Sequence, residues 1–436
     1  MTQMMEARKG VVTDAIRTVA KREKRDVEFI RERVADGRIV IPANIHHTHL
    51  VPCGIGRELF TKVNANIGNS MLTSGPEQEH VKLKSVLRYG ADTVMDLSTG
   101  DDIIPIRSAL IDQSPIPVGT VPVYEMVARE GRAGLCEKLV LQVIEEQAKQ
   151  GVDYITIHAG LLKRYVPMAM KRKLGIVSRG GALLAAWMYE HNHENPFYTA
   201  FDQILEICKE HDVTLSLGDG LRPGSLADAS DEAQFAELDT LGELVRRSRE
   251  AGVQAMVEGP GHVPLDEIQM NMEREQKVCD DAPFYILGPV VTDIAPGYDH
   301  FVAAMGGAMG AYHGAAMLCY VTPKEHIGLP NDDDVRRGII AFRIAAHVAD
   351  VGLHKPDARK WDDEMSDARA VFNWDRQFEL AIDPEHTRTL HDESIRESGK
   401  PDLHGTPYCT MCGPEFCSVR LFSALTKAMK ENPPEK

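Results

Sequence analysis

Short apolar and β-branched runs alternate with longer amphipathic segments from about residue 40 to about residue 330. This alternation is typical of βα units and predicts a parallel sheet covered by helices. Nine runs have the length and composition of strands, one more than an eight-stranded barrel contains, and we expect one of the last two to be a loop insertion or an accessory strand. These runs cover residues 62–67, 93–97, 116–123, 154–158, 175–178, 214–217, 254–258, 284–287 and 317–321.

Helices are predicted between most of these runs, for example over residues 76–89, 135–150, 201–210 and 232–251. The pattern favours an α/β fold, a (β/α)8 TIM barrel, and leaves an open doubly wound sheet as the alternative. Helical spacing at the N-terminus and again after about residue 333 predicts further helices outside the barrel. We therefore expect a barrel with an N-terminal helical lead-in over residues 1–332, a helical C-terminal domain over 333–400, and a separate tail over 401–436.

The composition is that of a globular protein with a large core: 436 residues, 43% hydrophobic and 26% charged. A formal net charge of -16 argues against nucleic acid as a partner, because phosphate backbones are bound by clustered Lys and Arg. No stretch approaches the roughly 20 apolar residues that span a bilayer, so we expect no membrane partner and a cytoplasmic location. In that compartment the eight cysteines would not form a disulfide framework.

Three of the cysteines lie within nine positions of a polar tail, at Cys409, Cys412 and Cys417. Single thiols fill gaps in a core, but three on a short polar loop have no core to fill, so their spacing indicates ligands. Three thiolates can hold a four-iron cluster with one iron open to a further ligand, or a zinc ion with a fourth ligand from elsewhere. Both alternatives remain open on spacing alone.

Polar or ionisable groups, often beside glycine, follow nearly every predicted strand. In a barrel these positions lie on one face, where active sites are built. Two loops, residues 178–181 and 219–224, combine glycines with an arginine, which suits a small phosphorylated substrate. The strand-end residues are Asn66, Met95, Tyr124, His158, Ser178, Arg179, Gly180, Asp219, Gly220, Leu221, Arg222 and Glu258.

Two histidines come from separate loops on the same predicted face. His262 lies in a Gly- and Pro-rich loop after the seventh run, and His326 follows the last run. Neutral imidazoles on adjacent loops can hold a divalent metal, with water or substrate completing its coordination. The spacing alone is a weak indication of such a site.

Long motifs resemble the ThiC family of radical S-adenosylmethionine (SAM) enzymes over nearly the whole chain. They lie at residues 63–70, 94–100, 156–160, 176–181, 216–224, 258–264, 292–300 and 318–326, and in the tail sequence CTMCGPEFC at 409–417. The resemblance implies a (β/α)8 barrel with a helical C-terminal domain, acting as a homodimer in which the tail of one subunit completes the site of its partner. It also implies a substrate, 5-aminoimidazole ribotide (AIR), which undergoes a radical rearrangement.

Carried over by motif, the resemblance implies that AIR contacts the strand-end residues above and Tyr285. It places a 4Fe-4S cluster on Cys409, Cys412 and Cys417, where reduced cluster would cleave SAM to methionine and a 5'-deoxyadenosyl radical. A divalent metal, zinc in the family, falls on His262 and His326. Glu258 and the three cysteines are the expected catalytic residues, and an electron donor such as flavodoxin or ferredoxin is the expected partner.

Two branches of the family share this substrate but make different products. One makes 5-hydroxybenzimidazole for the lower ligand of a cobamide; the alternative is the thiamine branch, which makes 4-amino-5-hydroxymethyl-2-methylpyrimidine phosphate. The chain departs from the usual thiamine-branch pattern in an early loop, residues 44–53, and at residues 311–313. Taking these loops to lie near the substrate, we expect a 5-hydroxybenzimidazole synthase.

Overall fold

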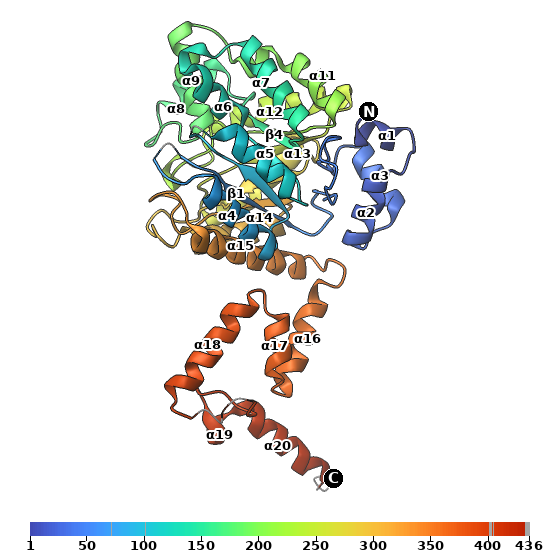
Figure 1. Cartoon of the computed structure of the whole chain (residues 1–436), viewed down its shortest axis with the longest axis vertical. Coiled ribbons are helices and arrows are strands. Elements are labelled where there is room, and N and C mark those ends of the chain that lie inside the picture. The colour runs from blue at the N-terminus through green and yellow to red at the C-terminus, as the bar shows by residue number, and fades with distance from the viewer. Residues whose placement is uncertain (71, 101, 401–402, 404, 432–436) are drawn as a thin grey trace. The chain divides into compact units, whose positions relative to one another are not determined.

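Eight parallel strands close into a barrel in which each strand pairs with the next along the chain and β8 pairs with β1. This computed structural model describes residues 1–70, 72–100, 102–400, 403 and 405–431. Figure 1 shows the strands surrounded by helices, so the predicted TIM-barrel fold is confirmed. The strands are β1 (Lys62–Ile67), β2 (Thr93–Asp96), β3 (Val118–Thr120), β4 (Tyr154–Ile157), β5 (Thr214–Leu217), β6 (Ala255–Gly259), β7 (Phe284–Leu287) and β8 (Met317–Cys319).

The surplus strand prediction is residues 175–178, which form a loop and not a strand. Gly175 has a positive φ of 64°, and Ser178 caps the next helix by accepting a hydrogen bond from the Gly181 N–H at 3.1 Å. A capping serine commits the chain to a helix, so the preceding β-branched residues have no strand partner. Our expectation that one of the last two runs would be an insertion was wrong, since both are barrel strands.

Helices join the strands on the outside of the barrel. After β1 to β4 these are α4 (Pro76–Arg88), α5 (Ile103–Gln113), α6 (Pro122–Glu130), α7 (Glu137–Gln150), α8 (Val166–Ala169), α9 (Arg179–His191), α10 (Pro196–Thr199) and α11 (Phe201–His211). After β5 to β8 they are α12 (Glu232–Ala251), α13 (Ile268–Val278), α14 (Asp299–Tyr312) and α15 (Asp332–Gly352).

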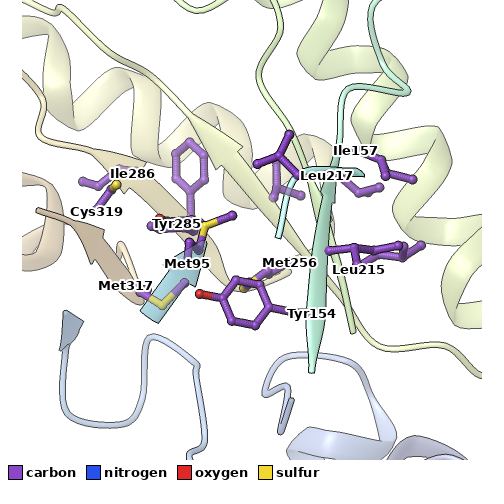
Figure 2. Packing of buried hydrophobic residues seen from close by; sticks show 14 of the residues in the cluster. Met95, Tyr154, Ile157, Leu215, Leu217, Met256, Tyr285, Ile286, Met317 and Cys319 are labelled. Atoms are coloured by element: carbon purple, nitrogen blue, oxygen red, sulfur yellow. Dashed lines mark hydrogen bonds between the residues drawn. The ribbon is translucent and has the colours of Figure 1, made fainter. Parts of the chain in front are cut away.

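Asn64 of β1 is the centre of a buried hydrogen-bond network inside the barrel, among mainly apolar side chains. Asn64 accepts hydrogen bonds from the hydroxyls of Thr93 and Tyr154, both at 2.8 Å, and donates one to the Tyr285 hydroxyl at 2.6 Å. Figure 2 shows the rings of Tyr154 and Tyr285 among methionines, of which Met95 lies beside Tyr285. A buried network whose members are paired in this way fixes one arrangement of the strands.

Three N-terminal helices and the end of α15 lie at the amino end of the barrel. The lead-in helices α1 (Gln3–Arg8), α2 (Asp14–Glu23) and α3 (Val27–Ala35) share a small apolar core. Glu23 of α2 forms a buried ion pair with Lys62 at 3.0 Å, and Asp350 of α15 pairs with Lys355 at 2.9 Å. Asp350 also accepts a hydrogen bond from the Thr61 N–H at 3.1 Å, which ties α15 to the start of β1.

The chain divides into two compact units, Met1–Pro356 and Asp357–Lys436. α15, nearly all of which falls within the range 333–400 predicted for the helical C-terminal domain, packs on α14 and α4 and lies in the first of these units. The second unit holds α16 (Ala358–Ala370), α17 (Trp374–Leu380), α18 (Pro384–Glu397), α19 (Gly413–Phe416) and α20 (Ser418–Glu431). None of the helices in the described part of the chain combines the length and hydropathy of a membrane span.

Candidate active site

A cavity of about 210 Å³ lies at the carboxyl ends of the strands, and most of the residues around it are the predicted strand-end residues. Nine of the thirteen residues predicted to bind substrate line it, from seven strands or the loops that follow them: Asn66, Met95, Tyr124, His158, Arg179, Asp219, Arg222, Glu258 and Tyr285. Thr156, Cys319 and Glu325 also line it and were not predicted. The barrel therefore gathers into one space side chains that are spread over more than 250 positions of sequence.

The floor of the cavity is a set of uncharged groups from β1, β2, β7 and β8. The Asn66 amide donates a hydrogen bond to the Cys319 sulfur at 3.0 Å, and the Tyr285 hydroxyl approaches the Met95 sulfur at 3.6 Å. Burial raises the pKa of the Cys319 thiol to about 12, so the thiol stays protonated. Sequence analysis did not single out Cys319, because nothing in a single buried cysteine distinguishes a cavity wall from a core position.

Glu258, at the end of β6, is a buried carboxyl group whose pKa lies near neutral pH. Its Oε1 accepts hydrogen bonds from the hydroxyls of Thr156 at 2.7 Å and Ser216 at 2.6 Å, on the two preceding strands. Burial, with the negative charge of Asp219, raises the pKa of Glu258 to about 7. A carboxyl group with this pKa can both give and take a proton near neutral pH, which is the property required of a general acid or base.

Arg222 and Asp219 form an ion pair on the loop after β5, with Nη1 and Oδ1 2.9 Å apart. The Arg222 side chain is about one quarter exposed and that of Asp219 is nearly buried. Burial raises the pKa of Asp219, and the adjacent guanidinium opposes the rise. A guanidinium held in place by a carboxylate is well suited to a phosphate or another anion in the cavity.

His158 is held as a neutral ring at the end of β4. Burial, with the positive charge of Arg222, lowers the pKa of His158 to about 3. Its Nε2 lies 3.1 Å from the Ser178 hydroxyl, and its Nδ1 has no hydrogen-bond partner among the described residues. This ring therefore presents an uncharged nitrogen to a ligand.

Four predicted residues do not line the cavity but shape the loops around it: Ser178, Gly180, Gly220 and Leu221. A Cβ on Gly180 would lie 2.4 Å from the His158 ring, and Gly181 is packed as closely against the Gly220 carbonyl. The glycines of the two Arg-containing loops are thus needed where the loops pack on each other and on His158. Sequence analysis connected these glycines with a phosphorylated substrate and did not predict this packing role.

A second cavity of about 290 Å³ shares Asn66, Leu97, Arg179 and Glu325 with the first. One of its walls is the loop Gly68–Ser70, which a buried carboxylate helps to hold. Glu79, buried on α4, accepts hydrogen bonds from the Gly68 N–H at 2.7 Å and from the Ser74 hydroxyl, and pairs with Lys82 at 2.8 Å. Sequence analysis missed Glu79, because a glutamate inside a helix has no feature that separates it from a surface residue.

His262 and His326 lie together, with ring centroids 5.2 Å apart. Each Nδ1 is held by an aspartate at 2.7 Å, His262 by Asp293 and His326 by Asp299. A carboxylate that binds Nδ1 fixes the orientation of the ring and leaves Nε2 free to bind a metal. Histidine ligands of metals usually have such a partner on their other ring nitrogen. These two rings and their aspartates fit a divalent ion with two imidazole ligands, and the metal itself stays a prediction.

The three tail cysteines surround the short helix α19 in the second unit. Cys412 precedes it and Cys417 follows it, while the Cys409 carbonyl accepts a hydrogen bond from the Gly413 N–H at 3.0 Å. All three are free thiols, yet no group of three His, Cys, Asp or Glu side chains is arranged as a metal site in the described residues. The donor set of three thiols within nine positions nevertheless fits an iron-sulfur cluster better than an ion that prefers oxygen.

Comparison with known families agrees with the motifs and the geometry. The family model described as the radical SAM ThiC family matches residues 2–424. The chain belongs to this family. The ThiC-family relatives include phosphomethylpyrimidine synthase of Halobacterium salinarum, 59% identical over 96% of this chain and 88% of that protein. The protein of the same name from Natronomonas pharaonis is 60% identical with the same coverage. Among solved structures, dihydropteroate synthase from Thermus thermophilus has a TM-score of 0.41 at 14% identity, over 71% of this chain and 99% of that one, a likeness too weak to indicate function.

The early loop on which the choice between family branches rested lies at the opposite end of the barrel from the cavity. Its Asn44 and His47 bind Asp153, which immediately precedes β4, at 3.0 and 2.7 Å. His47 also approaches the Ser114 carbonyl, ahead of β3, at 2.8 Å. Residues 311–313 likewise end α14 ahead of β8. Both departures therefore concern the amino ends of strands, and our premise that they lie near the substrate was wrong.

Proposed function

We propose that this protein is a phosphomethylpyrimidine synthase, which converts AIR to 4-amino-5-hydroxymethyl-2-methylpyrimidine phosphate. The observation that carries the proposal is the identity of 59–60% over 96% of the chain with ThiC-family relatives that bear this name. The comparisons give no support to 5-hydroxybenzimidazole synthase. The sequence differences that had favoured that product concern loops at the amino end of the barrel, where they contact no cavity residue that the structure describes.

The chain's own residues divide the work of binding AIR. Arg222, steadied by Asp219, supplies positive charge for the phosphate, while His158 supplies an uncharged ring nitrogen. The uncharged floor formed by Asn66 and Tyr285 offers hydrogen bonds without a charge that would have to be desolvated. Glu258 gives or takes protons as the substrate rearranges, since its pKa of about 7 keeps both forms available.

The tail cysteines would hold the cluster that the family uses. Cys409, Cys412 and Cys417 are the thiolate ligands in this proposal, and a 4Fe-4S cluster with bound SAM would supply the radical that starts the reaction. Half of the residues that line the cavity are buried, so the barrel would limit the access of bulk water to the reacting substrate. A one-electron donor, flavodoxin or ferredoxin, would be needed to reduce the cluster.

A divalent metal, zinc in this proposal, would be bound through Nε2 of His262 and His326. Asp293 and Asp299 hold the opposite ring nitrogens and so fix the orientation of both rings. Purified protein should contain bound divalent metal that is lost in His262→Ala, whereas His354→Ala, far along the chain from this loop, should retain it. Elemental analysis of both variants makes the comparison.

Helix α14 carries an exposed apolar stripe that would suit binding to a second copy of this chain. Phe301, Met305 and Tyr312 recur at helical spacing and are 53%, 64% and 48% exposed. Exposed apolar stripes of this kind are typical of interfaces. We propose that they contribute to a homodimer, and Met305→Glu should then shift the protein toward monomer in sedimentation velocity.

The decisive experiment is mass spectrometry of the product that reconstituted enzyme makes from AIR. Under anaerobic conditions with SAM and a reductant, the pyrimidine phosphate and 5'-deoxyadenosine should appear together. Formation of 5-hydroxybenzimidazole would show that the proposed product is wrong and that the protein is a 5-hydroxybenzimidazole synthase. Absence of 5'-deoxyadenosine with the cluster loaded and AIR bound would refute the radical reaction itself.

A further inference from the structure

A small cavity of about 20 Å³ lies behind the active site, between the ends of β5 and β6 and helices α12 and α13. Asp219, Arg222 and Glu258 line both this cavity and the main one, so the two spaces share a wall. On the far side the lining is Glu237 with Gln234 of α12 and Asn271 of α13. A cavity of this size accommodates about one water molecule, provided that polar groups face it.

Two buried carboxyl oxygens around this cavity lack hydrogen-bond partners in the described part of the chain. They are Oδ2 of Asp219, a residue 6% exposed, and Oε1 of Glu237, a residue 2% exposed. The other oxygens are engaged: Asp219 Oδ1 with Arg222 at 2.9 Å, and Glu237 Oε2 with the Leu221 N–H at 2.7 Å. Buried oxygens are rarely left unpaired, so a bridging water is the partner that this space allows.

We propose that Glu237 is a further proton-carrying residue of the active site, connected to Asp219 and Glu258 through one water in this cavity. This inference rests on the proposed function, because it assumes that Glu258 and Asp219 face AIR. Glu237 does not line the main cavity, and it acts on the substrate only through the other two carboxyl groups.

The proton balance is simple. When the Asp219–Glu258 pair gives a proton to the reacting substrate, the water passes a proton to Asp219 Oδ2 and takes one from Glu237 Oε1. Glu237 is left as a carboxylate, which the N–H groups of Leu221 and Gly220 stabilise. It regains its proton when the substrate gives one back to the Asp219–Glu258 pair at a later step and the water passes it on to Glu237. No electron is transferred, and the oxidation state of every group is unchanged.

The charges around Glu237 suit a group that holds a proton until it is needed. Burial raises the pKa of Glu237 well above its ordinary value, the negative charge of Asp219 adds to the rise, and Arg172 opposes it. Arg222, from the loop after β5, and Glu258 of β6 are the other charged side chains that face the cavity, while Asn271 from α13 is neutral. Burial and the charge of Asp219 thus both favour the protonated form of Glu237.

Glu237→Gln tests the inference, because it keeps the shape and the acceptor for the Leu221 N–H but cannot give up a proton. In the variant the Asp219–Glu258 pair must supply the proton unaided, and a group with a pKa of about 7 is only about one-tenth protonated at pH 8. The variant's kcat should therefore fall about tenfold relative to the unaltered enzyme at pH 8 and approach it near pH 6, with KM for AIR unchanged.

Glu275→Gln is the matched control. Glu275 on α13 is also fully buried, both its oxygens lack partners among the described residues, and burial raises its pKa well above normal, but it does not line either cavity. Its pH profile should match that of the unaltered enzyme. Equal profiles for Glu237→Gln and the unaltered enzyme would overturn the inference, and so would an equal shift in both variants.

Two further measurements separate the possible failures. Binding of AIR to the unaltered protein, followed by calorimetry, is required by the proposed function, and its absence would overturn the function and this inference with it. If Glu237→Gln does not fold, a crystal structure of the unaltered protein decides the matter. A water within hydrogen-bond distance of Glu237 Oε1 and Asp219 Oδ2 is expected, and a dry cavity would refute the proposal.

Discussion

Replacing Glu258 with glutamine should make the protein more stable above neutral pH, although it removes a catalytic group. Burial and the charge of Asp219 raise the pKa of Glu258 to about 7 from an ordinary value of 4.5. Between pH 4.5 and about 7 the folded protein therefore holds a proton on Glu258 that the unfolded chain has already released. Glutamine keeps the acceptor for the Thr156 and Ser216 hydroxyls and never ionises.

The sign follows from which state binds more protons. Between pH 4.5 and about 7 the folded state binds more, so stability falls as the pH rises through this window, and the full cost is present above it. The difference in pKa corresponds to about 3 kcal/mol, at about 1.4 kcal/mol per pH unit. For a barrel unit of this size that free energy corresponds to roughly 4 °C in melting temperature.

Scanning calorimetry of Glu258→Gln and the unaltered protein at several pH values measures the effect. The variant should melt about 4 °C higher at pH 8, with the gap closing as the pH approaches 4.5. Glu146→Gln is a suitable control because the pKa of Glu146 is lowered by its hydrogen bond with Arg129, so it should give no such gain. A constant gap across the pH range, or none at all, would refute the reasoning from burial.

Three other substitutions test separate parts of the site. Gly180→Ala should weaken AIR binding at least tenfold, because its Cβ would lie 2.4 Å from the His158 ring, whereas Gly328→Ala, with open space around it, should bind normally in calorimetry. Cys412→Ala should lose the visible absorbance of the reconstituted cluster and all turnover but keep its circular dichroism, while the exposed Cys136→Ala should keep all three properties. Arg222→Lys should weaken AIR binding by about 10- to 100-fold, since a charge-assisted hydrogen bond contributes about 1.5–3 kcal/mol; unchanged affinity would remove the phosphate-binding role.

The barrel and much of its cavity could be predicted from sequence because local patterns determine them. The buried strand runs specify β1 to β8, and since parallel strands end at one face, the residues that follow them meet there. The prediction of a strand at 175–178 shows the limit of this reasoning. Four apolar and small residues have the same composition in a strand and in a loop that leads to a helix cap, and only the partner strand distinguishes them.

Other residues were missed because their role depends on contacts between distant segments. Glu79 and Glu237 are helix residues whose carboxyl groups turn toward loops that follow strands. Their spacing in the sequence is that of ordinary helix positions. Only the packing of helix on barrel makes one of them the anchor of the Gly68 loop and the other a wall of the rear cavity.

The loop held by Asn44 and His47 also bears on how functions are assigned within a family. His47 binds Asp153 with both side chains fully buried, so a change there must be matched by its neighbours if the protein is to stay folded. Substitutions at that end will accumulate in compensating groups and can make two enzymes look distant while their substrate chambers remain the same. Differences in this loop therefore reflect constraints on folding stability and not the product of the enzyme. Relatives are better sorted by product when only residues on the cavity face are compared.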